Sequence, residues 1–257
     1  MNILFTVCCR AGSKSIKNKN LKLFLGTPLS YYTLASIRLY KKEFGSQDHF
    51  TTCLNTDSEE LITQVLDYDP EIHIIRRVES LAGDSVPKIA VIKDCLQKTE
   101  ENTGIKFNIV VDLDVTSPLR RVKDIHAAIE KKQKREDTDI VFSVTSARRN
   151  PYFNMVKVNS DGTVSRIIAS DFATRQQAPI LFDMNASIYA YGVDFLRNNA
   201  VNSLFDGRCD IIEMVDSAVL DIDSEEDFKL MEILGEYFYK TDHEFGEVAQ
   251  EAKIMKG

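Results

Sequence analysis

The sequence lacks the features that mark several large classes of protein. No apolar stretch approaches the length of a membrane span, and the short apolar run at residues 2–7 passes directly into polar sequence, so we expect neither a membrane segment nor a signal peptide. The 5 cysteines include no Cys-x-x-Cys pair and the 4 histidines no His-Glu-x-x-His motif, so a structural zinc is not expected. We predict free, mostly buried thiols and a cytoplasmic location.

Positive charge is also in deficit. The chain has 32 Lys and Arg against 39 Asp and Glu, a formal net charge of −7, which argues against a general nucleic-acid-binding protein because phosphate contacts need a basic face. A nucleotide ligand stays open, since a local cluster of cations can differ from the average. The length of 257 residues, 44% of them hydrophobic, suits one α/β domain. We find no internal repeat and no low-complexity segment.

Cations do gather in one loop near the beginning of the chain. Residues 2–7 have the apolar, β-branched composition of a buried strand, and Thr27-Pro28 begins a predicted helix. The loop between them holds Arg10, Lys14, Lys17 and Lys19 among small residues. Open α/β sheets bind ligands in the loop after such a strand, where backbone N–H groups and cations suit oxyanions. Neither the Walker A spacing nor Gly-x-Gly-x-x-Gly occurs there. We predict a loop that holds a triphosphate; the alternative is a solvated basic loop.

Apolar runs alternate with amphipathic segments along the next part of the chain. The predicted strands lie near residues 50–54, 72–75, 108–114 and 139–144, and the predicted helices near 28–44, 61–66, 87–96 and 122–134. This alternation predicts βαβ units and a largely parallel sheet. Thr56, Asp57 or Ser58, between the strand at 50–54 and the helix at 61–66, can cap that helix, and a cap is the expected role of Asp57.

The alternation breaks at residues 152–168, where Asp161-Gly162 predicts the turn of a hairpin. Such an excursion is either a lid or an arm that grips another subunit. Strands are expected again near residues 185–191 and 211–215, followed by a helix over 224–239. From Lys240 onward we expect a frayed polar tail.

Two acidic segments can supply oxygen ligands or polar contacts. In an extended Asp221-Ile222-Asp223, both carboxylates point to the same face, and two hard oxygen ligands beside a triphosphate suit Mg²⁺. The alternative is a helix start in which Ser224 or Asp223 caps the next helix. Residues 112–120 lie at the end of a central strand, where polar side chains face the ligand crevice. The alternative is a turn in which Thr116 or Ser117 caps the next helix.

These motifs resemble those of the cytidylyltransferases that make CMP-activated nonulosonic acids, of which the CMP-sialic acid synthetases are best known. The matching motifs are Arg10-Ala11-Gly12-Ser13-Lys14 with Lys19-Asn20-Leu21, Thr116-Ser117-Pro118-Leu119-Arg120, Arg175-Gln176 and Asp221-Ile222-Asp223. The resemblance covers residues 9–228 in family order. It implies a Rossmann-like nucleotide-diphospho-sugar transferase fold over residues 1–240, with a hairpin-containing dimerisation arm at 148–180 and a polar tail at 241–257.

The resemblance also implies a reaction and a role for each motif. CTP and a nine-carbon α-keto sugar acid would give the CMP-sugar and pyrophosphate, with Mg²⁺ as cofactor and a homodimer formed through the arm. The residues implied for CTP and catalysis are Arg10, Gly12, Ser13, Lys14, Lys19, Asn20 and Arg77, with Asp221 and Asp223 on the metal and Asp223 also counted as catalytic. The residues implied for the sugar acid are Asp84, Lys88, Asp114, Thr116, Ser117, Arg175, Gln176 and Asn185, with Arg175 on its carboxylate.

The chain departs from the sialate pattern at Lys17, where Pro is usual, at Asp114, where a Gln contacts the sugar, and at Ala186, where Gly is usual. Asp114 is expected in the branch that resembles CMP-legionaminic acid synthetases, and residues 148–153 and 183–189 also look closest to that branch. We therefore predict N,N′-diacetyllegionaminic or N-acetylneuraminic acid as acceptor. Pseudaminic acid, 3-deoxy-octulosonate and a non-catalytic nucleotide-binding regulator remain alternatives.

Overall fold

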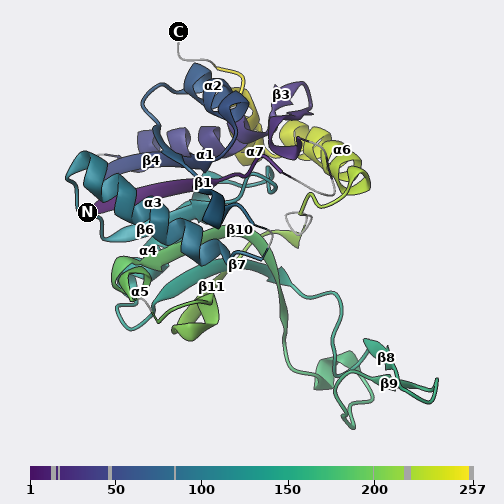
Figure 1. Ribbon diagram of the computed structural model, residues 1–257. Coiled ribbons are helices and arrows are strands. Elements are labelled where there is room, and N and C mark those ends of the chain that lie inside the picture. The colour runs from purple at the N-terminus through teal and green to yellow at the C-terminus, as the bar shows by residue number, and fades with distance from the viewer. Residues whose placement is uncertain are drawn as a thin grey trace.

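The computed structural model describes residues 1–12, 16, 18–45, 48–83, 85–198, 200–216 and 221–254. A seven-stranded sheet forms its centre, in the order β11-β7-β10-β6-β1-β4-β5 (Figure 1). The bounds of these strands are β1 Asn2–Cys8, β4 His49–Thr56, β5 His73–Arg76, β6 Ile109–Leu113, β7 Ile140–Ser146, β10 Phe182–Gly192 and β11 Cys209–Glu213. The predicted strands are thus confirmed, each within a few residues of its expected ends.

The sheet is mostly parallel, as predicted. Strand β1 pairs in parallel with β4 and β6, β4 with β5, and β7 with β11, whereas β10 runs antiparallel to both β6 and β7. The carboxyl ends of β1, β4, β5 and β6 therefore meet at one edge, which is where the predicted ligand-binding loops begin.

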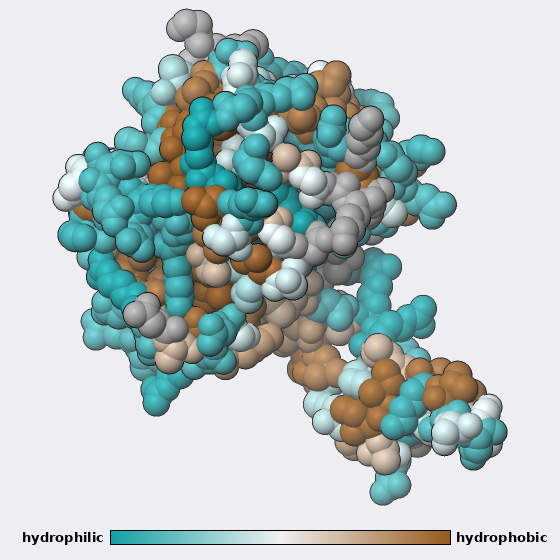
Figure 2. Space-filling view, viewed as in Figure 1, coloured by the Kyte–Doolittle hydropathy of each residue, from teal (hydrophilic) through white to brown (hydrophobic). Residues whose placement is uncertain are grey.

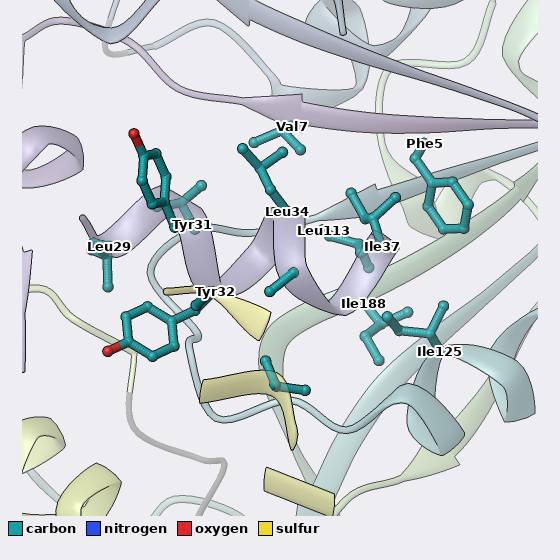
Figure 3. Close-up of a cluster of buried hydrophobic side chains, with 14 of the residues drawn as sticks. Phe5, Val7, Leu29, Tyr31, Tyr32, Leu34, Ile37, Leu113, Ile125 and Ile188 are labelled. Atoms are coloured by element: carbon teal, nitrogen blue, oxygen red, sulfur yellow. The ribbon is translucent and has the colours of Figure 1, made fainter. Parts of the chain in front are cut away.

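Helices cover both faces of the sheet, because alternate residues of each central strand point to opposite sides. Ile3, Phe5 and Val7 of β1 pack in one cluster with α1, α2, α4, α6 and α7, while Leu4 packs in a second cluster with α3 and α5. Figure 3 shows part of the larger cluster, with side chains of α1 beside strand residues such as Leu113. The helices are α1 Leu29–Phe44, α2 Glu59–Tyr68, α3 Lys88–Thr103, α4 Val122–Lys134, α5 Val193–Arg197, α6 Glu225–Thr241 and α7 His243–Glu251.

The last helix, α7, corrects the expectation of a frayed polar tail. Phe245, Val248, Ala249 and Ala252 are buried against α1 and α6, and Asp242 caps the helix by accepting the Glu244 N–H. The spacing of these four residues is that of one helical face. The prediction was wrong because it weighed the polar composition of the segment and not this periodicity. Among the described residues, no helix is both long and apolar enough to cross a membrane.

Residues 148–180 leave the sheet and carry the predicted hairpin on a projecting arm (Figure 1). The hairpin strands are β8 Val156–Val158 and β9 Val164–Arg166, and the turn uses Gly162 at φ +82°. A smaller hairpin, β2 Leu23–Phe24 with β3 Thr27–Pro28, precedes α1. The hairpin turn predicted at Asp161-Gly162 is therefore confirmed.

Strand β10 contains an irregularity at Ala186. The register of β10 against β7 shifts between Met184 and Tyr189, and within this bulge Ala186 has φ +51°. That left-handed conformation suits glycine and disfavours a residue with a Cβ by about 1–2 kcal/mol. The position at which the chain departs from the family's usual Gly is therefore a strained one.

Candidate active site

One cleft at the carboxyl edge of the sheet gathers most of the residues predicted to be functional. Its volume is about 290 Å³. Its walls come from the loops after β1, β5 and β6, the beginning of α3 and the segment before α6. The lining residues are Cys8, Arg10, Lys19, Asn20, Arg77, Leu81, Gly83, Val86, Lys88, Val91, Asp114, Thr116, Asp221 and Asp223.

The cleft joins the beginning of the chain to its end. Lys19 Nζ donates to the carbonyl of Ile222 at 2.7 Å and lies 3.5 Å from Asp223 Oδ1. The predicted phosphate-binding cations and the predicted metal-binding acids thus meet, although more than 200 residues separate them in sequence. Ser13, Lys14, Lys17 and Asp84, which the sequence also singled out, lie outside the described residues.

The loop after β1 is fixed by contacts with its neighbours. Asn20 Nδ2 donates to the Arg10 carbonyl at 3.1 Å, and the Ala11 N–H donates to Asp57 Oδ1 at 2.6 Å. The cap of α2 is Ser58, one of the three candidates, whose hydroxyl accepts the Leu61 N–H. The expected capping role of Asp57 was therefore wrong. Asp57 instead anchors the basic loop to the end of β4.

Gly12 and Arg77 occupy different surroundings. Gly12 lies in the exposed part of the loop, and a Cβ there would meet nothing within 4 Å, so close packing does not demand a glycine. Arg77 lines the cleft, and its Nε donates to Asn55 Oδ1 at 2.6 Å. Asn55 is fully buried near the end of β4. Sequence reasoning missed it because the strand was expected to end at residue 54, whereas β4 continues through Asn55 to Thr56.

The floor of the cleft is an ionic cluster. Lys88 Nζ lies 2.7 Å from Asp112 Oδ2 and 2.7 Å from Asp114 Oδ2. Burial opposes the charged form of Lys88, yet the two carboxylates raise its pKa well above the usual value. Burial likewise opposes ionisation of Asp114, but Lys88 and hydrogen bonds from Thr116 hold the pKa of Asp114 well below its usual range.

Thr116 links this cluster to the acids from the end of the chain. Its hydroxyl lies 2.8 Å from Asp114 Oδ1 and also forms a short hydrogen bond with Asp221 Oδ1. A hydroxyl carries one proton, so it can donate to only one carboxylate at a time. Burial and the nearby charges of Asp114 and Asp223 raise the pKa of Asp221. The site therefore holds more carboxylate charge than its own donors satisfy.

The buried side chain of Arg120 holds the motif of residues 116–120 in place. It is only 1% exposed; its Nη2 donates to the carbonyls of Asp114 at 2.7 Å and Ser187 at 2.8 Å, and its Nε donates to Ser187 Oγ. Burial lowers its pKa to about 10, which still leaves it charged at neutral pH. Arg120 therefore positions the backbone at Asp114 against the bulge of β10. The motif alone did not reveal this role.

Four predicted substrate residues lie away from the cleft in this chain. Ser117 is 1% exposed, and Asn185 is buried with Oδ1 accepting the Ser143 hydroxyl at 2.6 Å. Arg175 and Gln176 line a second hollow, of about 200 Å³, at the base of the arm, where Arg175 Nη2 donates to the Ala147 carbonyl. The described residues of a single chain therefore do not unite Arg175 with the ionic floor.

The fold and the cleft together define an α/β protein of the nucleotidyltransferase class. Basic and acidic side chains face one another at the carboxyl edge of a mostly parallel sheet, the usual position of a nucleotide site. Residues 4–242 match the family described as Cytidylyltransferase, and the chain belongs to this family. The predicted family and fold class are confirmed.

Similar proteins agree with this assignment. The chain is 37% identical over 232 residues to the Post-translational flagellin modification protein B of Campylobacter coli and 36% identical over 235 residues to the CMP-N,N′-diacetyllegionaminic acid synthase of Campylobacter jejuni. Each match covers 90% of this chain and 94% of the relative. A solved structure of CMP:2-keto-3-deoxy-manno-octonic acid synthetase complexed with CTP is similar in fold, with a TM-score of 0.63 at 15% identity, covering 92% of this chain and 99% of the other.

Proposed function

We propose that this protein transfers the CMP group of CTP to a nonulosonic acid, with N,N′-diacetyllegionaminic acid as the first candidate, and releases pyrophosphate. The observation that carries the proposal is the cleft in which Arg10 and Lys19 face Asp221 and Asp223. Family membership and the relative named as a CMP-N,N′-diacetyllegionaminic acid synthase support the same reaction.

In this proposal the basic loop binds the triphosphate. Arg10 and Lys19 neutralise phosphate charge at the cleft, and Gly12, Ser13 and Lys14 continue the same loop. Asn20 and Arg77 contact the nucleoside, and the bond from Arg77 to Asn55 holds the guanidinium in one orientation. Transfer of a nucleotidyl group is helped chiefly by positioning and by neutralisation of charge, and the chain supplies both.

Asp221 and Asp223 are the proposed ligands of Mg²⁺. The donor set fits, because both offer hard oxygen atoms and because Asp221 is a desolvated carboxyl beside two like charges, which a cation would relieve. The described residues contain no cluster of three or more potential protein ligands, so phosphate and water oxygens would complete the coordination. When bound, the metal would neutralise the phosphates and lower the pKa of the attacking sugar hydroxyl.

The proposed sugar site begins at Lys88, Asp114 and Thr116 on the cleft floor. Ser117 and Asn185 lie just behind the surface and contribute through packing and through backbone geometry. Asp84 belongs to the same proposed site. Arg175 and Gln176 belong to it only if a second copy brings its arm to this cleft.

We propose that the arm is the dimer interface. Its exposed side chains are unusually apolar, and Figure 2 shows brown patches over the projecting segment. Val158 is 74% exposed and Ile180 is 83% exposed. A contiguous apolar surface of this kind marks an interaction site. A homodimer that buries it would present Arg175 to the carboxylate of the sugar acid in the partner's cleft, as a bidentate donor.

Complementation between inactive variants tests this arrangement. Arg175→Ala and Asp223→Ala are each expected to be inactive, and mixed dimers of the two should regain activity because one of their two clefts receives an intact residue from each chain. A monomer in analytical ultracentrifugation, or mixed dimers that stay inactive, would contradict the shared site. A cytoplasmic location is part of the proposal, since the reaction draws on CTP and all 5 cysteines are free.

Pyrophosphate release tests the reaction itself. CTP and Mg²⁺ are incubated with N,N′-diacetyllegionaminic, N-acetylneuraminic, pseudaminic or 3-deoxy-octulosonic acid. Fastest turnover is expected with the first, and Asp223→Asn should abolish it. Glu225→Gln is the matched control, because Glu225 pairs with Lys22 on the surface and does not line the cleft. CTP binding with no turnover of any acid would instead identify a nucleotide-binding regulator.

A further inference from the structure

Asp112 is a carboxylate that the proposed mechanism does not use. It is the fourth of the five residues of the central strand β6, its side chain is 0% exposed, and it is not among the residues that line the cleft. Thr6 Oγ1 donates to its Oδ1 at 2.7 Å, and Lys88 Nζ lies 2.7 Å from its Oδ2. A carboxylate at such a site is unfavourable unless it is paired, so its presence needs an explanation.

The position of Lys88 also needs an explanation. Lys88 is the first residue of α3, and the first turn of this helix contains no acidic residue. A cation is disfavoured at a helix N-terminus by the helix dipole. Lys88 is held there by Asp112 and Asp114, and its ammonium group also lies 5.5 Å from the centre of the Tyr189 ring.

The geometry gives the cleft floor a donor beside an acceptor. An ammonium has three N–H donors. Lys88 donates one of them to Asp114 Oδ2, whereas its 2.7 Å contact with Asp112 Oδ2 is an ion pair without hydrogen-bond geometry. Each oxygen of a carboxylate has two lone pairs. The contacts described for the Asp114 side chain come from Lys88 and Thr116 alone, so Asp114 can accept a further hydrogen bond. A secondary amide offers the complement, a carbonyl acceptor next to an N–H donor.

We propose that Lys88 and Asp114 bind an acylamino group of the sugar acid, and that Asp112 is a positioning residue that holds Lys88 in this pair. The inference rests on the proposed function and adds to it the substituent that the enzyme selects. Without Asp112, Lys88 would pair with Asp114 alone, and its ammonium group would cover the carboxylate oxygens of Asp114 that are proposed to accept from the ligand. With Asp112, the ammonium is shared between two carboxylates at equal distance, and Asp114 stays open to the ligand.

Steady-state kinetics of Asp112→Asn test the proposal, because asparagine keeps the shape of the side chain and removes its charge. The KM for the N-acylated acid is expected to rise by about tenfold or more, as for loss of a charged hydrogen bond, while the KM for CTP stays within about twofold. The same variant should leave the KM for 3-deoxy-octulosonate, which lacks an acylamino group, within about twofold. Asp124→Asn is the matched control, since Asp124 is a buried aspartate paired with Arg121 away from the cleft.

The double variant Asp112→Asn/Lys88→Met separates positioning from a general structural effect. If Asp112 acts through Lys88, the double variant has the sugar-acid KM of Lys88→Met alone. An equal rise in the KM for CTP, or a double variant that loses the product of both single effects, would overturn the proposal. Failure of the wild-type enzyme to turn over any acid would instead remove the proposed function, which the wild-type assay shows before any variant is made.

Discussion

Substitution of Ala186 by glycine is expected to stabilise the protein, although glycine usually weakens a strand. Ala186 has φ +51° in the bulge of β10, which costs a residue with a Cβ about 1–2 kcal/mol. Glycine removes that strain but brings greater freedom in the unfolded chain, worth about 0.5–1 kcal/mol. The half-buried methyl group contributes little, so the net gain is about 0.5–1 kcal/mol.

The gain should appear as a higher midpoint in urea and a Tm raised by about 1–4 °C for a chain of this size. Ala190→Gly is the matched control, because Ala190 lies in the same strand, is 0% exposed and has ordinary backbone angles. It should lower stability by about 1–2 kcal/mol through lost burial and added chain entropy. If Ala186→Gly destabilises the protein as much as Ala190→Gly does, residue 186 is not under strain and the account of the bulge fails.

Three further outcomes follow from the same structure. Arg120→Met should lower the free energy of unfolding by about 3–5 kcal/mol in urea titrations, because it leaves two buried carbonyls and the Ser187 hydroxyl without their donor. The control Arg149→Met, at an exposed position, should change this free energy by less than about 0.5 kcal/mol. Phe245→Ala should lower it by about 3–5 kcal/mol and Ile254→Ala, an exposed position, by under about 0.5 kcal/mol; equal effects would mean that α7 is not packed as described. Asp221→Asn should abolish turnover yet raise the Tm near pH 7 in EDTA. Burial and like charges raise the pKa of Asp221 in the folded state. Ionised Asp221 therefore lowers the free energy of unfolding. This loss of stability is absent below the ordinary pKa of 3.8 and grows as the pH rises through the folded-state pKa. Thermal melts at about pH 3.5 and 7 check this sign, and a Tm gain that is larger at the lower pH would contradict it.

Much of the fold was readable from the sequence, because hydrophobic periodicity and turn residues report directly on local structure. The strands predicted at residues 2–7 and 108–114 are found at Asn2–Cys8 and Ile109–Leu113 for that reason, and the hairpin turn at Asp161-Gly162 is found as predicted. The helix α7 was missed although its signal was of the same kind. Here the composition of a polar segment was given more weight than the spacing of its few apolar residues.

Site residues were predictable where a motif exposes their side chains. They were unpredictable where a side chain is buried and acts through its contacts with other residues. Lys19, Asp221 and Asp223 were placed in one cleft by sequence reasoning, and the structure brings them together. Asp112 and Arg120 were not given roles, since burial of a charged residue depends on tertiary partners that local sequence does not reveal. Arg175 lies at a separate hollow in the single chain, and its predicted contact with the sugar acid stays a prediction.

The hydrogen bond between Lys19 and the carbonyl of Ile222 has a consequence for biosynthesis. A ribosome-bound chain that stops short of residue 221 can pair β1 with β4 and β6, yet its basic loop has no acidic counterpart to close against. Such truncated products also lack α6 and α7, so they are predicted neither to complete the larger core cluster nor to consume CTP. The core and the cleft are thus both completed only late in translation, when the carboxyl-terminal segment packs against the first part of the chain.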